Sequence, residues 1–129
     1  MIRVKRVYDS PANRDGARFL VDHLWPRGVK KEAVQVERWI KAVSPSNELR
    51  SWFGHEPPKW KEFQRRYFEQ LDGKPDAWAP LLEAARTKDI TLVFSARDPE
   101  HNNAVALKLY LEKKLGRKTP RKRGSTAGQ

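Results

Sequence analysis

Ile90-Thr91-Leu92-Val93-Phe94 is the clearest candidate for a buried strand in this sequence. Five apolar or β-branched residues in a row, with polar residues on either side, are typical of a buried strand. A helix is predicted to follow it, from His101 to about Leu115. The core-facing residues of that helix are predicted to be Val105, Leu109 and either Leu111 or Leu115. A buried strand that leads into a helix favours helices packed on a sheet.

Two further strands are predicted upstream. Residues 2–8 alternate apolar and basic over their first half, which indicates a strand with one covered face. Residues 17–24 are largely apolar and predict a central strand, and residues 9–16 form a loop between the two. The run 25–28 ends the second strand, because a proline cannot donate to a ladder and a glycine permits a tight turn.

The middle of the chain is predicted to be helical. Ser46 is a candidate N-cap for a short helix, Asn47–Phe53, with Gly54 closing it. A longer helix runs from Pro57 to about Leu71, and a further helix runs from about Pro75 to Thr87. Their apolar stripes are Trp60, Phe63, Tyr67 and Leu71 in the first, and Trp78, Leu81, Leu82 and Ala85 in the second. Residues 30–35 fit one helical turn, whereas 36–43 fit a strand or a helical turn equally well.

These elements predict an α/β fold: one compact domain, residues 1–115, with a small, at least partly parallel sheet and helices packed on it. Residues 116–129 form a basic tail, which its composition predicts to be disordered. The chain has a net charge of +11, and seven Lys or Arg with no acid stand from Lys113 onward. Subtracting those seven leaves +4 on residues 1–112. The positive charge of the tail therefore indicates either a loose, salt-dependent attraction to nucleic acid or a simple solubilising role.

Composition excludes several classes of protein. The chain has no cysteine, which excludes a disulfide scaffold, a thiolate metal site and cysteine nucleophile chemistry. No apolar run is long enough to cross a bilayer, and the N-terminus does not resemble a secretory signal. We therefore expect a cytoplasmic protein with no membrane partner. No feature indicates an oligomeric state.

Polar residues gather after two of the predicted strands, where ligands bind in open α/β sheets. The first segment holds Asp22 and Arg27, and the second holds Arg97, Asp98, His101 and Asn102. Asp98 and Pro99 have the positions of an N-cap and a first helical residue, so helix initiation alone explains part of the second segment. Helix initiation does not explain His101 and Asn102. A helix start with Arg27 beside it would also suit an anion.

Asp22 is expected to need a partner, since an unpaired buried charge is costly. Arg27 is the nearest candidate in sequence and Arg97 is the alternative. An ion pair with a purely structural role and a functional carboxylate explain Asp22 equally well. His101, paired with Asp98, is a candidate general acid or base.

Other patterns are less specific. No spacing of histidines and carboxylates matches a metal motif, so we expect no metal, and nothing identifies a cofactor. The aromatic and basic residues of 50–68 resemble a nucleic-acid stacking surface, but their helical spacing favours a core for most of the aromatics. His55 either reaches the same site as the strand-end residues or lies in a loop.

Three separated motifs resemble the YeaO-like bacterial proteins, which carry domain of unknown function 488. They are Phe19-Leu20-Val21-Asp22-His23-Leu24-Trp25-Pro26-Arg27-Gly28, Ser44-Pro45-Ser46-Asn47-Glu48-Leu49-Arg50-Ser51-Trp52-Phe53 and Asp98-Pro99-Glu100-His101-Asn102-Asn103-Ala104. The resemblance covers roughly residues 1–115 and implies a small α/β protein without an established activity or cofactor. His23 stands where the family pattern has arginine, which makes Arg27 the more important basic residue.

The leading hypothesis is a protein that binds or acts on an anionic small molecule, such as a nucleotide, at the strand-end site. Asp22 and His101 would transfer protons, and Arg27, Arg97, Asp98, Asn102 and His55 would bind the ligand. The alternatives are an accessory protein that binds nucleic acid through its tail and basic surface, and an interaction module without catalysis. The sequence does not decide whether the protein is an enzyme.

Overall fold

The computed structural model describes residues 1–116, which contain one four-stranded, wholly parallel sheet. Its strands are β1 (Ile2–Arg6), β2 (Ala17–Leu20), β3 (Arg38–Trp39) and β4 (Ile90–Phe94), in the spatial order β1-β4-β2-β3. The last strand thus lies between the first two, with Ile2 and Ala17 both in register with Ile90. The predicted α/β class and its parallel sheet are confirmed.

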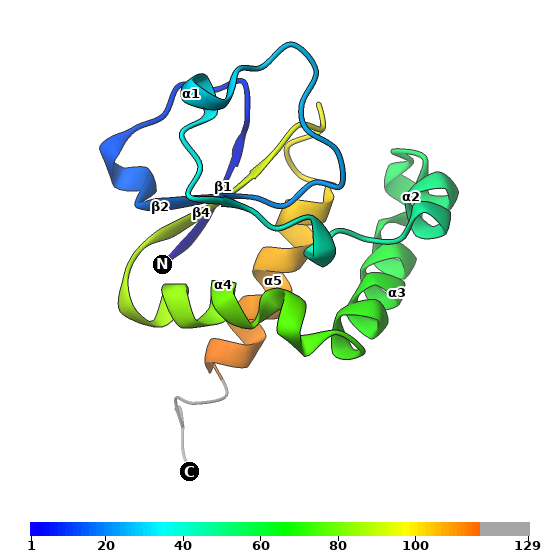
Figure 1. The fold of residues 1–129 in the computed structure, drawn as a ribbon. Helices are drawn as coiled ribbons and strands as arrows, with labels where there is room; N and C mark the ends of the chain where they lie inside the picture. Colours follow the sequence, from blue (N-terminus) through cyan, green and yellow to red (C-terminus); the bar gives the residue numbers. More distant parts are fainter. Residues whose placement is uncertain (117–129) are drawn as a thin grey trace.

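Five helices belong to this domain: α1 (Lys31–Val34), α2 (Asn47–Phe53), α3 (Trp60–Asp72), α4 (Pro75–Thr87) and α5 (Asn103–Gly116). Short 3-10 turns occur at Asn13–Asp15, Lys41–Val43 and Pro57–Lys59. Figure 1 shows α3, α4 and α5 on one side of the sheet and α1 on the other. The predicted bounds of α2 and α4 are confirmed.

The sheet has a different core on each face because side chains alternate along a strand. Phe19, Leu92 and Phe94 face the larger core, which the residues of α2–α5 complete. Leu20 and Val93 face the smaller core, formed with Val34 of α1. The helix stripes predicted for α3 and α4 lie in or against the larger core, and Phe63, Tyr67 and Leu71 are almost completely buried.

Several predicted bounds need correction, and one open assignment is decided. β1 ends at Arg6 rather than residue 8. β2 ends at Leu20 rather than residue 24, so Asp22 follows the strand instead of lying in it. The ambiguous run 36–43 is neither one strand nor one helix: β3 pairs for two residues with β2, and a 3-10 turn follows.

The last helix differs in its start and in its face. It begins at Asn103, two residues later than predicted. Its buried residues are Ala104, Ala106, Leu107, Tyr110 and Leu111, whereas Leu109 is exposed. Ala104 and Ala106 are fully buried in the larger core, whereas Val105 is only half-buried although it is more apolar.

No helix within residues 1–116 has the length and apolar character needed to span a membrane. The predicted tail, residues 116–129, lies outside the described residues except for Gly116, so its predicted disorder stays a prediction.

Candidate functional site

A pocket of about 660 Å³ lies beyond the carboxyl ends of β2 and β4, the two central strands. Asp22 follows β2 and Ser95 follows β4, so the parallel pairing brings both residues to one edge of the sheet. We call this the main pocket. Its lining residues are Asp22, His23, Leu24, Ser44, Pro45, Arg50, His55, Ser95, Ala96, Arg97, Asp98 and Asn103.

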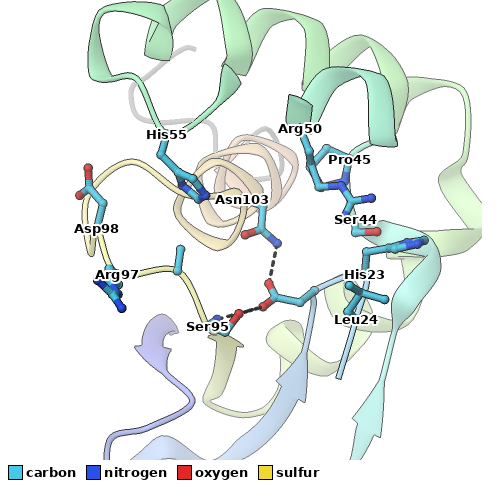
Figure 2. Close-up of a pocket in the computed structure, with 12 residues that line it drawn as sticks. His23, Leu24, Ser44, Pro45, Arg50, His55, Ser95, Arg97, Asp98 and Asn103 are labelled. Atoms are coloured by element: carbon cyan, nitrogen blue, oxygen red, sulfur yellow. Dashed lines mark hydrogen bonds between the residues drawn. The ribbon is translucent and has the colours of Figure 1, made fainter. Parts of the chain in front are cut away.

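Asp22 accepts three hydrogen bonds, all from uncharged donors. The backbone N–H and the hydroxyl of Ser95 donate to Oδ2 over 2.9 and 2.7 Å, and the amide of Asn103 donates to Oδ1 over 3.1 Å. Figure 2 shows these bonds as dashed lines that join Ser95 and Asn103 through one carboxylate. The carboxylate therefore connects the end of β4 to the first residue of α5.

Of the two explanations left open for Asp22, the ion pair with Arg27 or Arg97 does not form in the described residues. Arg27 is exposed and lies outside the lining of the main pocket, whereas Arg97 belongs to that lining. Hydrogen bonds from neutral groups satisfy a carboxylate without a cation, which is why the argument from buried charge selected the wrong partner.

The segment before α5 forms a turn around Asp98. Oδ1 of Asp98 accepts from the backbone N–H groups of Glu100 and His101 at 2.9 and 3.2 Å, and Oδ2 lies 2.8 Å from Nδ1 of His101. The Glu100 N–H, and after it the His101 ring, hold the pKa of the Asp98 carboxyl below its usual value. Both carboxylate oxygens are therefore occupied.

Asn102, not Asp98, is the N-cap of α5. Its Oδ1 accepts from the backbone N–H of Val105 at 3.0 Å, and its Nδ2 donates to the carbonyl of Asp98. Asn102 is 3% exposed, as expected for a cap that closes the helix start against the core. This role explains Asn102 without a ligand.

A smaller cavity of about 120 Å³ adjoins the main pocket, and we call it the side pocket. Its lining residues are Pro45, Arg50, Phe53, His55, Phe63, Ala96, His101, Asn102 and Asn103. Of the two pockets, His101 lines the side pocket, with its ring packed edge-on against Trp60 at 5.3 Å between centroids. The two predicted proton-transfer residues thus line different cavities: Asp22 lines the main pocket and His101 the side pocket.

Arg50 lines both pockets and was not among the predicted site residues. It lies on α2, where the hydroxyl of Ser46 caps the helix by accepting from Leu49 N–H at 3.1 Å. The Arg50 guanidinium donates to Asn47, but its Nε is buried and has no hydrogen-bond partner among the described residues. The sequence held one signal for it: Arg50 is three residues before buried Phe53, and so it lies beside the apolar face of α2.

His55 lines both pockets as well, at the end of α2. Gly54 closes the helix with φ +54°, and His55 continues in the same left-handed region with φ +59°. A non-glycine residue rarely adopts this conformation, and the side chain of His55 is exposed. Of the two readings left open for His55, the structure places it at the site.

Hydrogen bonds from Tyr67 and Lys74 fix the part of the main pocket wall that Ser44 and Pro45 form. Buried Tyr67 donates its hydroxyl to the carbonyl of Val43 at 2.6 Å, and Lys74 donates to the carbonyl of Ser44 at 2.9 Å. Burial, and secondarily the charge of Asp22, raises the pKa of the Tyr67 hydroxyl, so it stays a donor. Burial lowers the pKa of the Lys74 ammonium. The wall is therefore fixed to the helical core.

The lining of the main pocket offers a ligand more hydrogen-bond donors than acceptors. Both lining carboxylates accept several hydrogen bonds within the protein, whereas the Arg50 guanidinium is only partly satisfied. In Figure 2, Arg50, Ser44 and His23 lie on one side of the cavity, and Arg97, Asp98 and His55 lie on the other. Nowhere in residues 1–116 do three or more His, Asp or Glu side chains group as metal ligands would. The arrangement suits an acceptor-rich, anionic ligand.

Comparisons with known proteins agree on one family. Residues 1–127 match a family model described as the inactive DUF488-N3 subclade. The chain is 37% identical over 110 residues to the uncharacterized protein YeaO of Escherichia coli, covering 85% of this chain and 96% of YeaO. It is 39% identical over 106 residues to uncharacterized proteins of Mycobacterium bovis (Mb3100c) and Mycobacterium tuberculosis (Rv3073c), covering 82% of this chain and 89% of each. No solved structure matches the chain.

Proposed function

The chain belongs to the YeaO-like DUF488 family, within the subclade described as inactive, and from this membership and its pocket we propose that it binds a small anionic molecule without converting it. The resemblance drawn from its three motifs is thereby confirmed. The ligand carries a carboxylate or phosphate group, which the donors of the main pocket receive.

The observation that carries this proposal is the state of Arg50. A buried N–H of a charged group without a partner costs free energy, and native proteins rarely leave one unsatisfied. A ligand oxygen in the adjoining pockets supplies the missing acceptor after a small rotation of the side chain. The planar guanidinium is also well suited to a carboxylate or phosphate, because it can donate two parallel hydrogen bonds.

Binding without turnover agrees with the positions of the titratable groups. Asp22 is engaged by three donors, and His101 is paired with Asp98 and lines the other cavity. A general acid and base must both reach the reacting atoms, which this separation disfavours. The description of the matching family as inactive supports the same reading.

The test compares two single arginine variants, Arg50→Gln and Arg27→Gln, with acetate and inorganic phosphate as probes. Arg50→Gln is expected to weaken binding of the probes about 10- to 100-fold, which corresponds to the loss of about 1.5–3 kcal/mol from a hydrogen bond to a charged group. Chemical-shift titration of the backbone amides measures weak affinities and also locates the site.

Arg27→Gln is the matched control, because it removes the same charge at an exposed position outside the pocket lining. Binding that is lost in the Arg27 variant and retained in the Arg50 variant would transfer the site to the residue chosen from sequence. If neither probe shifts the amides around Ser95 and Asn103, the proposed function is wrong.

A further inference from the structure

A second surface with aromatic side chains lies outside both pockets, where α1 and β3 border a groove of about 410 Å³. We call it the tryptophan groove. Its lining residues are Trp25, Lys31, Val36, Glu37, Arg38 and Trp39, none of which lines the main pocket or the side pocket. Trp25 and Val36 pack against the smaller core, so the groove belongs to the face of the sheet that α1 covers.

The two indole rings of the groove are held in place by the protein. Trp25 donates its ring N–H to the carbonyl of Val29, and Trp39 donates its own to the carbonyl of Asp22, both at 2.7 Å. The rings meet edge-on, with 5.6 Å between their centroids. Trp39 remains 36% exposed. The groove therefore offers a ligand fixed aromatic surface, and the indole N–H groups are already engaged.

Positive charge surrounds these rings. Residues 27–41 hold five basic and two acidic residues, a net charge of +3, which is most of the +4 on residues 1–112. Lys31 and Arg38 line the groove, and Nζ of Lys41 lies 4.7 Å from the centre of the Trp39 ring. The ion pairs within residues 1–116 involve none of these three cations. They are therefore available to the anionic groups of a ligand.

The aromatic and basic stretch 50–68 lacks this property. Glu62 pairs with Arg65 and Arg66 at 2.7 and 2.8 Å, and Arg66 also lies 4.2 Å from the centre of the Trp52 ring. Carboxylates thus neutralise the arginines of α3 and hold one of them over the aromatic ring. Lys41 has no carboxylate to hold it over Trp39, so a phosphate can draw it away. Of the two surfaces, the tryptophan groove is the one suited to a ligand that is both planar and anionic.

We infer that the tryptophan groove binds single-stranded nucleic acid, with a base stacked on Trp39 and the neighbouring phosphates at Lys31, Arg38 and Lys41. A ring face accepts any base, and basic side chains beside it neutralise the backbone. A duplex is a poorer ligand, because its bases already stack on one another. This inference goes beyond the proposed anion site at Arg50 and does not depend on it.

The experiment measures the fluorescence anisotropy of two labelled strands titrated with the full chain. One is an oligothymidylate of about ten nucleotides, and the other is an abasic strand of the same length. The unmodified chain is expected to bind the oligothymidylate about 5- to 100-fold more tightly, the contribution of one stacked base. The ratio of the two affinities cancels the attraction of the basic tail, because both strands carry the same phosphates.

Three tryptophan variants locate the stacking. Trp39→Leu removes the ring and should bring the ratio close to one. Trp39→Phe keeps an aromatic face but loses the hydrogen bond to Asp22, and it should retain most of the ratio. Trp52→Leu, the matched control on the neutralised surface, should leave the ratio unchanged.

Salt dependence tests the cations separately. The double variant Lys31→Gln/Arg38→Gln should reduce the slope of log affinity against log salt concentration by about 0.7 for each lost phosphate contact. Arg65→Gln removes a cation that Glu62 and Glu69 already neutralise, and it should leave the slope unchanged.

Three results would overturn the inference. Equal affinity of the unmodified chain for the two strands would show that no base is stacked. Equal losses of the ratio in Trp39→Leu and Trp39→Phe would show that the ring face is not responsible. Loss of the ratio in Arg50→Gln would place the strand in the main pocket instead, whereas an unchanged ratio in that variant keeps the two sites distinct.

Discussion

Asp22 shows how a carboxylate can be stabilised at the end of a strand without a cation. Its partners come from two elements far apart in sequence, Ser95 after β4 and Asn103 at the start of α5. Asn103 also donates to the carbonyl of Val21 at 3.1 Å. The Asp22 side chain therefore links β2, β4 and α5, and we attribute to Asp22 a structural role in shaping the pocket.

Replacing Asp22 with alanine is expected to destabilise the fold. The change leaves the N–H of Ser95 without its acceptor and removes one of the two acceptors of the Asn103 amide, and the expected loss in the free energy of unfolding is about 2 kcal/mol. Urea denaturation followed by tryptophan fluorescence measures it. Asp9→Ala, at an exposed position, is the matched control and should change stability by less than about 0.5 kcal/mol. Equal effects of the two variants would refute the structural role.

At the residue scale, the sequence predicted where the site lies better than it predicted which residues form it. Asp22, Arg97, Asp98 and His55 do line the main pocket, and His101 and Asn102 line the side pocket. Arg27 lines neither. Its position five residues after Asp22 suggested proximity. After β2, however, Trp25 and Val29 pack against the smaller core on the α1 face of the sheet, and only the folded structure brings Arg50 to the pocket instead.

At the scale of elements, α2 is the helix that contributes Arg50, the arginine that lines both pockets. Ser46 caps its start, and Gln70 of α3 both accepts from the Ser46 backbone N–H and donates to its hydroxyl. The cap therefore sets the start of α2 and ties it to α3 at the same time. Since Arg50 is one turn along this helix, its position depends on the cap.

Ser46→Ala should lower the free energy of unfolding by about 1 kcal/mol, the typical cost of losing an N-cap, with a further loss from the unsatisfied Gln70 amide. Thermal or urea unfolding measures the change. Ser51→Ala, at an exposed position inside the same helix, is the control and should be neutral or slightly stabilising because alanine is the better helix former. A loss at Ser46 no larger than that at Ser51 would show that the cap is dispensable.

The helix ends also show where local signals compete. Ser46-to-Gly54 contained one good cap at each end, and the predicted bounds of α2 were correct. Before α5, both Asp98 and Asn102 are good N-caps. Asp98 is engaged by the turn with Glu100 and His101, so Asn102 performs the capping, and no local rule ranks the two in advance.

At the scale of the whole molecule, the concentration of positive charge and the residues that line the pockets lie in different parts of the chain. Every residue that lines the two pockets lies between Asp22 and Asn103. The concentration of Lys and Arg begins at Lys113. The competing hypothesis of nucleic-acid binding through the tail is therefore separable from ligand binding by truncation.

Removing residues 117–129 should leave acetate and phosphate binding unchanged within about twofold, and should abolish any binding of double-stranded DNA at low salt. The deletion removes five of the seven basic residues that stand from Lys113 onward, and contacts to phosphates weaken steeply with salt. Electrophoretic mobility shifts at two salt concentrations measure the second effect. Unaltered DNA binding by the truncated chain would assign that binding to the domain surface.

Features that depend on neighbours along the chain followed from the sequence alone: the buried strand Ile90–Phe94, the helix stripes of α3 and α4, and the caps of α2. Hydrophobic periodicity and helix capping depend on residues close together in the chain, so they can be recognised without the fold. The insertion of β4 between β1 and β2, which brings Asp22 to Ser95 and Asn103, emerges only from the folded structure. Strand order and the partner of a polar side chain depend on contacts between residues more than seventy positions apart, which no local pattern encodes.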